Sequence, residues 1–381
     1  MPKARLATPR LHAIGKRSPA TVILGARQVG KSTLARLAFP DHTFFDLEDP
    51  RHEARFAADP LFALSQQTKV VIDEAQRLPS LFPILRSYLD ANARRRVVLL
   101  GSASPGLMPS ISESLTGRAV FFDLGGISCL EEDPARLWRL GGFPRLHWTR
   151  PRALPDEWYP SYLRTTLERD IPQLGVTLPA ARARALLTLV ANGQGSTLNL
   201  SELGGPLGVS YHTVTAALDV LEGVFLVRRL PPFVANIGKR LVKSPKVYVR
   251  DTGILHLLLG MGWTRASQLA HPKIGASWET FCIEQLISHA ALVDPASEAF
   301  FFRTQTGVEV DLLLRLRGEL VAFEMKLGLT ARDTRPMKSA MADLGIKRGY
   351  QVNAGEGLVA LEKGIWVGGI REVIESLKMR P

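Results

Sequence analysis

Residues 25–32, GARQVGKS, place two glycines, a lysine and a serine at the spacing G-x-x-x-x-G-K-[ST]. Glycines let the backbone turn tightly, so that successive amides face phosphate oxygens. Lys31 can reach the β- and γ-phosphates, and the Ser32 hydroxyl can bind Mg²⁺. The apolar run 22–24 precedes this loop and a helical pattern follows it, which is the context the motif requires. We therefore predict a site for ATP and Mg²⁺ formed by Gly25, Ala26, Arg27, Gln28, Val29, Gly30, Lys31, Ser32 and Thr33.

Two adjacent carboxylates, Asp73 and Glu74, stand at the end of a predicted strand that starts at Lys69 and continues with three apolar residues. In a parallel sheet the carboxyl end of a strand opens onto the ligand crevice. Asp73 is then placed to hold Mg²⁺ through water, and Glu74 to polarise the attacking water. The alternative is a polar strand end without a catalytic role.

Two residues later in the chain have types that can assist hydrolysis. Ser102 follows the apolar run 97–100 and is the candidate γ-phosphate sensor, although a turn rich in small residues explains it as well. Arg118 precedes an apolar run, 119–124, and is a candidate arginine finger acting on the nucleotide of a neighbouring subunit. That role requires an oligomer, and an ordinary surface salt bridge is the alternative.

Strands expected near residues 22, 44, 70, 97 and 120, with helices between them, predict an α/β sandwich with a mostly parallel sheet. This P-loop unit is expected to span residues 1–128. Helical periodicity over 130–140, 158–168 and 180–191 then predicts a helical lid, residues 129–190. The segment Gly141–Pro144 breaks the first pair of helices.

Residues 191–269 have the layout of a winged helix-turn-helix. A helix begins at Asn199 or Ser201, residues 204–208 form the turn, a second helix covers 209–221, and 224–230 alternate like a β-wing. The second helix would offer Tyr211, His212 and Thr213 to a DNA major groove, and the wing would offer Arg228 and Arg229 to phosphates. The alternative is a winged helix that serves only protein packing.

The charge distribution favours a polyanionic partner. The 381 residues carry 48 Lys and Arg against 36 Asp and Glu, a formal net charge of +12. Residues 139–250 hold 15 of these cations against 7 anions, and 228–250 contain no acid. Such a surplus attracts nucleic acid. We therefore add Lys239, Arg240 and Lys243 to the candidate DNA-binding residues.

The last unit, residues 270–381, contains a second chemical pattern. A helix over 280–292 and strands over 300–303, 307–316 and 320–326, with a hairpin turn at 317–319, predict an α/β domain. Alternation along the strands places the acids on common faces. Carboxylates that converge require a divalent cation, beside which a lysine steadies the reacting phosphate. The pattern E…D…E-x-K is that of PD-(D/E)xK nucleases, with a retained scaffold as the alternative, and its members are Glu279, Asp311, Glu324 and Lys326.

Cys129 and Cys282 are far apart and show no metal or redox spacing, which predicts two reduced thiols. No apolar run reaches membrane-spanning length, and the first 17 residues lack a hydrophobic signal core. We therefore expect a cytoplasmic protein without a membrane partner.

The chain resembles the bacterial and archaeal AAA-type ATPases that join a P-loop domain to a winged helix and a nuclease-like C-terminal domain. The resemblance implies that Gly30, Lys31, Ser32, Asp73 and Glu74 form the ATPase set, with Ser102 as sensor and Arg118 acting in trans. The family commonly has Thr where this chain has Ser32, which supplies the same hydroxyl. The matching stretches keep their order: GARQVGKSTL, VVIDEAQRLPSLFPILR, GSASPGLM, ESLTGR, GGFPR, YLRTTLERDI, KSPKVYVRDTGIL, GASWETFCIEQL and GVEVDLLL…FEMK.

Three functions are compatible with these patterns. The first is a ring-forming motor, a hexamer by preference, that remodels or translocates DNA as a helicase or branch-migration enzyme does. The second is a nucleotide-gated switch with slow turnover. The third is a metal-dependent DNA nuclease regulated by ATP.

Overall fold

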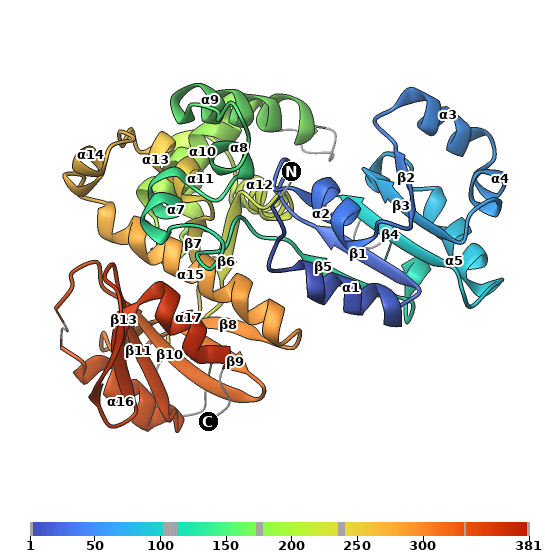
Figure 1. The fold of residues 1–381 in the computed structure, drawn as a ribbon. Helices are drawn as coiled ribbons and strands as arrows, with labels where there is room; N and C mark the ends of the chain where they lie inside the picture. The colour runs from blue at the N-terminus through green and yellow to red at the C-terminus, as the bar shows by residue number, and fades with distance from the viewer. Residues whose placement is uncertain are drawn as a thin grey trace.

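The computed structural model describes residues 3–101, 111, 113–172, 178–234, 241–330 and 333–378. The chain forms three lobes (Figure 1). The N-terminal lobe contains a five-stranded sheet, the middle lobe is mainly helical, and the C-terminal lobe contains a six-stranded sheet.

The N-terminal sheet is parallel throughout, with the strand order β2-β3-β4-β1-β5, which confirms the predicted α/β architecture. The apolar runs form its central strands because both faces are covered, and every residue of β1 is buried. Its strands are β1 (Ala20–Leu24), β2 (Thr43–Asp46), β3 (Lys69–Asp73), β4 (Arg96–Gly101) and β5 (Ala119–Asp123). The surrounding helices are α1 (Thr8–Arg17), α2 (Lys31–Ala38), α3 (Pro50–Ala58), α4 (Pro60–Ser65), the 3₁₀ turn η1 (Ala75–Arg77) and α5 (Leu81–Asp90).

The middle lobe starts with a helix that is shorter than expected. The predicted helix over 130–140 begins only at Pro134, where the Asp133 side chain accepts a hydrogen bond from the Arg136 amide and so caps the first turn. The predicted break at Gly141–Pro144 is present. The helices are α7 (Pro134–Leu140), α8 (Pro144–His147), α9 (Pro155–Thr165), the π-helix η2 (Thr166–Asp170), α10 (Ala180–Asn192), α13 (Thr252–Leu258) and α14 (Arg265–Leu269).

Two helices and an antiparallel ribbon follow in the region expected to hold a helix-turn-helix. They are α11 (Leu200–Leu207), α12 (Tyr211–Gly223), β6 (Val227–Leu230) and β7 (Lys246–Val249). Asn199 caps α11 by accepting from two backbone amides. The predicted turn over 204–208 is wrong: the helix continues to Leu207 and ends at Gly208, whose φ of 61° is the left-handed conformation that ends helices.

The C-terminal sheet has the order β12-β13-β11-β10-β9-β8. The predicted hairpin joins β9 to β10 through Arg317 and Gly318, whose φ values of 51° and 84° suit a tight two-residue turn. The elements are α15 (Ile274–Val293), β8 (Glu298–Arg303), β9 (Glu309–Leu316), β10 (Glu319–Met325), α16 (Arg335–Leu344), β11 (Arg348–Asn353), β12 (Leu358–Glu362), β13 (Ile365–Gly369) and α17 (Ile370–Lys378).

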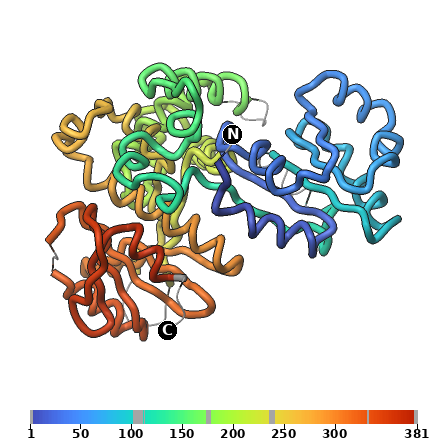
Figure 2. Tube along the Cα trace, viewed as in Figure 1, coloured from blue at the N-terminus to red at the C-terminus, as the bar shows by residue number. Residues whose placement is uncertain are grey.

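Part of the middle lobe shares an apolar core with the C-terminal lobe, whereas most of its buried residues cluster with the N-terminal lobe. Leu230 and Tyr248 of the ribbon belong to the same buried cluster as Trp278 of α15. The long helix α15 lies between the two lobes (Figures 1 and 2). In the part of the chain that the structure describes, no helix has the length and apolarity needed to cross a bilayer.

Candidate functional site

The phosphate loop leaves the carboxyl end of β1, which lies between β4 and β5 in the parallel sheet. Gly25 is required by a close approach, because a Cβ built there would lie 2.7 Å from the Leu124 carbonyl oxygen. Gly30 has a φ of 101°, a conformation that glycine adopts without strain. The Lys31 side chain curls back, and its Nζ donates to the carbonyl oxygens of Gly25 and Ala26 at 2.9 and 3.0 Å. Among the described residues its hydrogen bonds are to backbone carbonyls, with Asp73 and Glu74 as charged neighbours, and this arrangement fits a bound polyphosphate.

The predicted magnesium and water-activating groups lie beside the loop. Asp73 ends β3, and a hydrogen bond with Ser32 links it to the start of α2. Burial raises the pKa of Asp73, and the bonds from Ser32 and the Glu74 amide oppose that rise. Burial also raises the pKa of Glu74, against the charge of Lys31. A carboxylate with a raised pKa accepts a proton more readily at neutral pH, as a general base must. Ser32, Asp73 and Glu74 therefore lie together beside the phosphate loop, and their roles in hydrolysis stay predictions.

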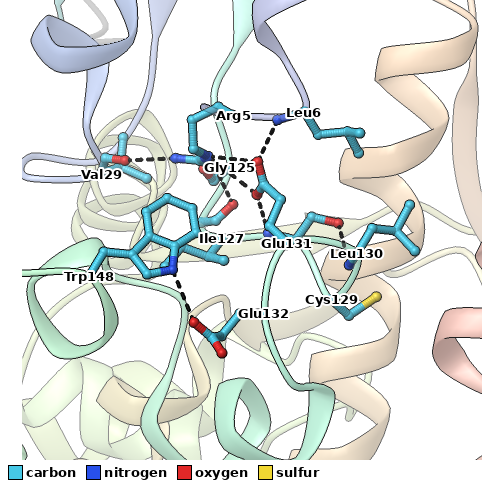
Figure 3. Close-up of polar contacts among 12 residues, drawn as sticks. Arg5, Leu6, Val29, Gly125, Ile127, Cys129, Leu130, Glu131, Glu132 and Trp148 are labelled. Carbon is cyan, nitrogen blue, oxygen red and sulfur yellow. Dashed lines mark hydrogen bonds and ion pairs between the residues drawn. The ribbon is translucent and has the colours of Figure 1, made fainter. Parts of the chain in front are cut away.

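Arg5 holds the phosphate loop from the side opposite β3 and was not predicted. It is 8% exposed, and its guanidinium donates to the carbonyl oxygens of Val29, Gly125 and Gly126. Glu131 accepts from Arg5 Nε at 3.2 Å and from the Leu6 amide (Figure 3). No motif spacing marks a lone arginine in a basic lead-in, and only its contacts reveal that it positions the loop.

The phosphate loop also touches the middle lobe. Arg27 pairs with Asp170 at the end of η2 and with Glu48. A Cβ built on Gly30 would lie 3.7 Å from Pro144, the first residue of α8. Asp170 and Pro144 are thus additions to the predicted site, and both come from the segment expected to form a lid.

The remaining predicted ATPase residues have different surroundings. Ser102 lies outside the described residues. Arg118 makes a bidentate ion pair with Asp90 of its own chain, at 2.7 and 2.9 Å. The next residue, Ala119, pairs with Ala20 at the amino end of β1, so Arg118 lies at the end of the sheet opposite the phosphate loop. It lies away from the nucleotide site of its own subunit, so a catalytic role would require action in trans, and the pair with Asp90 is the salt bridge given as the alternative.

The predicted DNA-binding residues divide into exposed and paired groups. Tyr211 is 56% exposed, and its ring lies 3.9 Å from that of His212, while Thr213 is half-buried at the start of α12. Lys243 is exposed, whereas Lys239 and Arg240 lie outside the described residues.

The two wing arginines have acidic partners within the chain. Arg229 pairs with Asp219 and Glu222 of α12. Arg228 pairs with Glu284 of α15, which also accepts from Arg250 at 3.0 Å. Burial would raise the pKa of Glu284, but these two arginines lower it to about 2.

The predicted nuclease residues come together at the junction of α15, β9 and β10. Burial, followed by the charge of Asp311, raises the pKa of Glu279 to about 7. Burial also raises the pKa of Glu324, although a bond from Lys326 at 2.8 Å opposes the rise. Asp311 accepts from the Met325 amide at 2.8 Å.

The arrangement does not fit a divalent metal as it stands. In the described part of the chain, no group of three or more His, Cys, Asp or Glu side chains is placed to hold a metal ion. Two side chains of β7 already bind the Glu279 carboxylate. Lys246 Nζ contacts Oε1, and the Tyr248 hydroxyl donates a hydrogen bond to the same oxygen at 2.7 Å. The sequence did not single out Lys246, because it is one of several cations in a basic stretch.

Comparison with known proteins places these features in a family. Two uncharacterized mycobacterial proteins, Rv2008c of Mycobacterium tuberculosis and Mb2031c of Mycobacterium bovis, are each 42% identical over 360 residues, which cover 92% of this chain and 80% of theirs. The chain belongs to their family. An AAA domain matches residues 17–132, and two domains of unknown function, DUF8612 and DUF4143, match residues 131–265 and 274–373. The chain therefore contains an AAA-type ATP-binding domain.

Two solved structures are also similar. The Walker-type ATPase PABY2304 of Pyrococcus abyssi is 15% identical with a TM-score of 0.45, covering 68% of this chain and 98% of its own. A signal-transduction ATPase with a tetratricopeptide-repeat sensor, from Pyrococcus horikoshii, is 13% identical with a TM-score of 0.25, covering 74% of this chain and 47% of its own.

Proposed function

We propose that the chain is an ATP-hydrolysing nucleotide switch, whose AAA domain passes the state of the bound nucleotide to the middle lobe. The observation that carries this proposal is the ion pair between Arg27 of the phosphate loop and Asp170 of η2. Pro144 of α8 also faces the loop, since a Cβ built on Gly30 would lie 3.7 Å from it. A change in the loop therefore acts directly on residues of the helical segment.

The residues divide the chemistry among themselves. The loop amides and Lys31 would hold the phosphates, and Ser32 with Asp73 would hold Mg²⁺, which supplies charge neutralisation at the transferring phosphoryl group. Glu74 would orient and deprotonate the attacking water. Arg5 fixes the loop backbone through Val29 and is a positioning residue.

A DNA-remodelling ring motor is the alternative, and the charge arrangement favours the switch over it. The cationic stretch 228–250 was its main support, yet Arg228, Arg250 and Lys246 are paired with acids from the C-terminal lobe. The helix expected to enter the major groove, α12, contains no Lys or Arg. Tyr211 and Lys243 remain exposed and are the contacts that a DNA-binding mode would use.

An ATP-regulated nuclease would need a divalent cation among Glu279, Asp311 and Glu324. We do not propose it for the chain as folded, because Lys246 supplies the positive charge there instead.

Phosphate release with and without DNA tests the switch against the motor. We expect turnover on the order of 10⁻² s⁻¹, as in slow nucleotide switches, and a change of less than about twofold on adding single-stranded, duplex or forked DNA at low salt. Lys31→Ala should lose nucleotide binding, Glu74→Gln should bind ATP without hydrolysing it, and Lys16→Ala, an exposed lysine on α1, should match the wild type. A tenfold stimulation by any DNA would favour the motor, and equal turnover by Glu74→Gln and the wild type would exclude Glu74 as the base.

A further inference from the structure

A lysine from the middle lobe lies inside the carboxylate cluster of the C-terminal lobe. Lys246 Nζ is 2.6 Å from Glu309 Oε1 and 3.5 Å from Glu279 Oε1. Its side chain is 3% exposed. A lysine is rarely buried to this extent unless acids surround it. The contact joins β7 to both α15 and β9.

The backbone around Lys246 holds the ammonium in place. The backbones of Thr197 and Lys246 pair as an isolated antiparallel β-bridge. Two residues further along β7, the Tyr248 hydroxyl donates a hydrogen bond to Glu279. Gly195 covers the same carboxylate so closely that a Cβ there would lie 3.2 Å from Glu279 Oε1. Lys246 is therefore fixed by the strand that carries it, unlike a surface lysine that happens to meet an acid.

The four acids of the cluster, Glu279, Glu309, Asp311 and Glu324, are only partly neutralised, by Lys246, Lys326 and Arg303. Lys326 neutralises Glu324 through Oε1 at 2.8 Å, and Lys246 is shared between Glu279 and Glu309. Glu324 is 8% exposed, and its second oxygen, Oε2, is buried without a hydrogen-bond partner among the described residues. Lys326 therefore satisfies only one of the two Glu324 oxygens.

We propose that Lys246 is the resident cation of this cluster and excludes a divalent metal from it. An ammonium and a divalent cation are alternative ways to neutralise the same converging carboxylates. Without Lys246, the freed oxygens of Glu279 and Glu309, together with the neighbouring Asp311 carboxylate, offer hard ligands to Mg²⁺ or Mn²⁺. The carboxylates that the sequence pattern identifies then form a cation site in the folded chain, and the Lys246 ammonium already fills it.

Calorimetric titration of Mn²⁺ into nucleotide-free full-length protein tests this proposal. All variants carry Asp73→Asn, so that the ATPase site does not contribute. The parent should show no binding below about 1 mM, and Lys246→Met should gain a site at least tenfold tighter. Adding Asp311→Asn to Lys246→Met should abolish that site. Lys243→Met, an exposed lysine three residues earlier, is the matched control and should gain nothing.

Each other outcome overturns the proposal. The parent and Lys246→Met could bind Mn²⁺ with equal affinity, and both could lose it on adding Asp311→Asn. That result would show a metal site that Lys246 does not block. No binding by either would show that the cluster takes no divalent metal. If Lys246→Met does not fold, Lys246→Gln replaces it in the titration. The melting temperature of Lys246→Gln should rise with Mn²⁺ but not with NaCl of equal ionic strength. An equal rise with both salts counts against the proposal.

Discussion

The Arg5 guanidinium and the Glu131 carboxylate form a buried ion pair across 126 residues of sequence, with Arg5 Nε 3.2 Å from Glu131 Oε1. The same arginine bonds to Val29 of the phosphate loop and to Gly125 and Gly126 beyond β5 (Figure 3). It thereby joins the start of the chain, the nucleotide-binding loop and the entry to the middle lobe. A buried arginine with these partners costs stability when it is removed, because the partners are left unpaired.

Arg5→Ala should lower the free energy of unfolding by about 3 kcal/mol and weaken ATP binding about tenfold, since the Val29 carbonyl loses its donor. Urea denaturation and titration with a fluorescent ATP analogue measure the two effects. Arg17→Ala, which removes an exposed arginine at the end of α1, is the matched control and should change neither. Wild-type affinity in a folded Arg5→Ala protein would contradict a positioning role.

Asp170→Asn should leave nucleotide binding intact and remove the effect of the bound nucleotide on the middle lobe. We expect ATP affinity within about threefold of wild type, because Asp170 lies outside the phosphate loop, and loss of the ATP-dependent slowing of hydrogen exchange over residues 155–170. Glu168→Gln, which removes an exposed acid paired with Arg164, should keep the slowing. Unchanged slowing in Asp170→Asn would remove the Arg27–Asp170 pair from the switch.

Arg118→Ala should bind ATP normally and hydrolyse it at least tenfold more slowly if the side chain acts across a subunit interface. The comparison with Asp90→Asn decides its role, since that change removes the ion-pair partner and keeps the arginine. Equal losses in the two variants would indicate a structural salt bridge. Partial recovery on mixing Arg118→Ala with Glu74→Gln subunits would demonstrate action in trans.

Glu284→Gln should destabilise the chain by about 3–5 kcal/mol, because Arg228 and Arg250 would both lose their buried counter-ion. Thermal and urea unfolding measure the loss. Glu157→Gln, on the exposed first turn of α9, should stay within about 0.5 kcal/mol of wild type. A small effect of Glu284→Gln would mean that these arginines are solvated and free to meet an external anion.

Stability should fall as pH drops from 6.5 towards 4, because of His256. Burial lowers the pKa of His256 to about 4, and its Nε2 bonds to Ser277 Oγ at 2.7 Å. The unfolded chain binds the proton below about pH 6.5 and the folded chain does not, so up to about 3 kcal/mol is lost across this window. Unfolding free energies of wild type and His256→Gln measured between pH 4 and 7 check this, and parallel curves would exclude His256 as the cause.

The sequence predicts the features of the ATPase site that depend on local pattern. The phosphate loop and the Asp73–Glu74 pair follow apolar runs directly, and parallel strands bring their carboxyl ends to one edge of the sheet. Arg5 and Asp170 were missed because their partners lie 126 and 143 residues away. Such contacts are chosen by tertiary packing and leave no periodic signal in the chain.

The count of charges over residues 139–250 overestimated the positive charge available to a partner. The acids that neutralise Arg228, Lys246 and Arg250 come from α15 and β9, outside that window. A charge surplus within one stretch predicts a cationic surface only if the stretch is not packed against an acidic one.

The seam between the ribbon and the C-terminal sheet limits how the chain can be divided for study. Phe301 of the edge strand β8 exchanges backbone bonds with Pro231 and Phe233, and Val242 donates to Arg303. A fragment beginning at residue 270 would expose this edge and leave a hole where Leu230 and Tyr248 fill the core. Because unpaired edges recruit strands from other molecules, such a fragment should aggregate. Expression of the C-terminal lobe by itself therefore has to retain the ribbon.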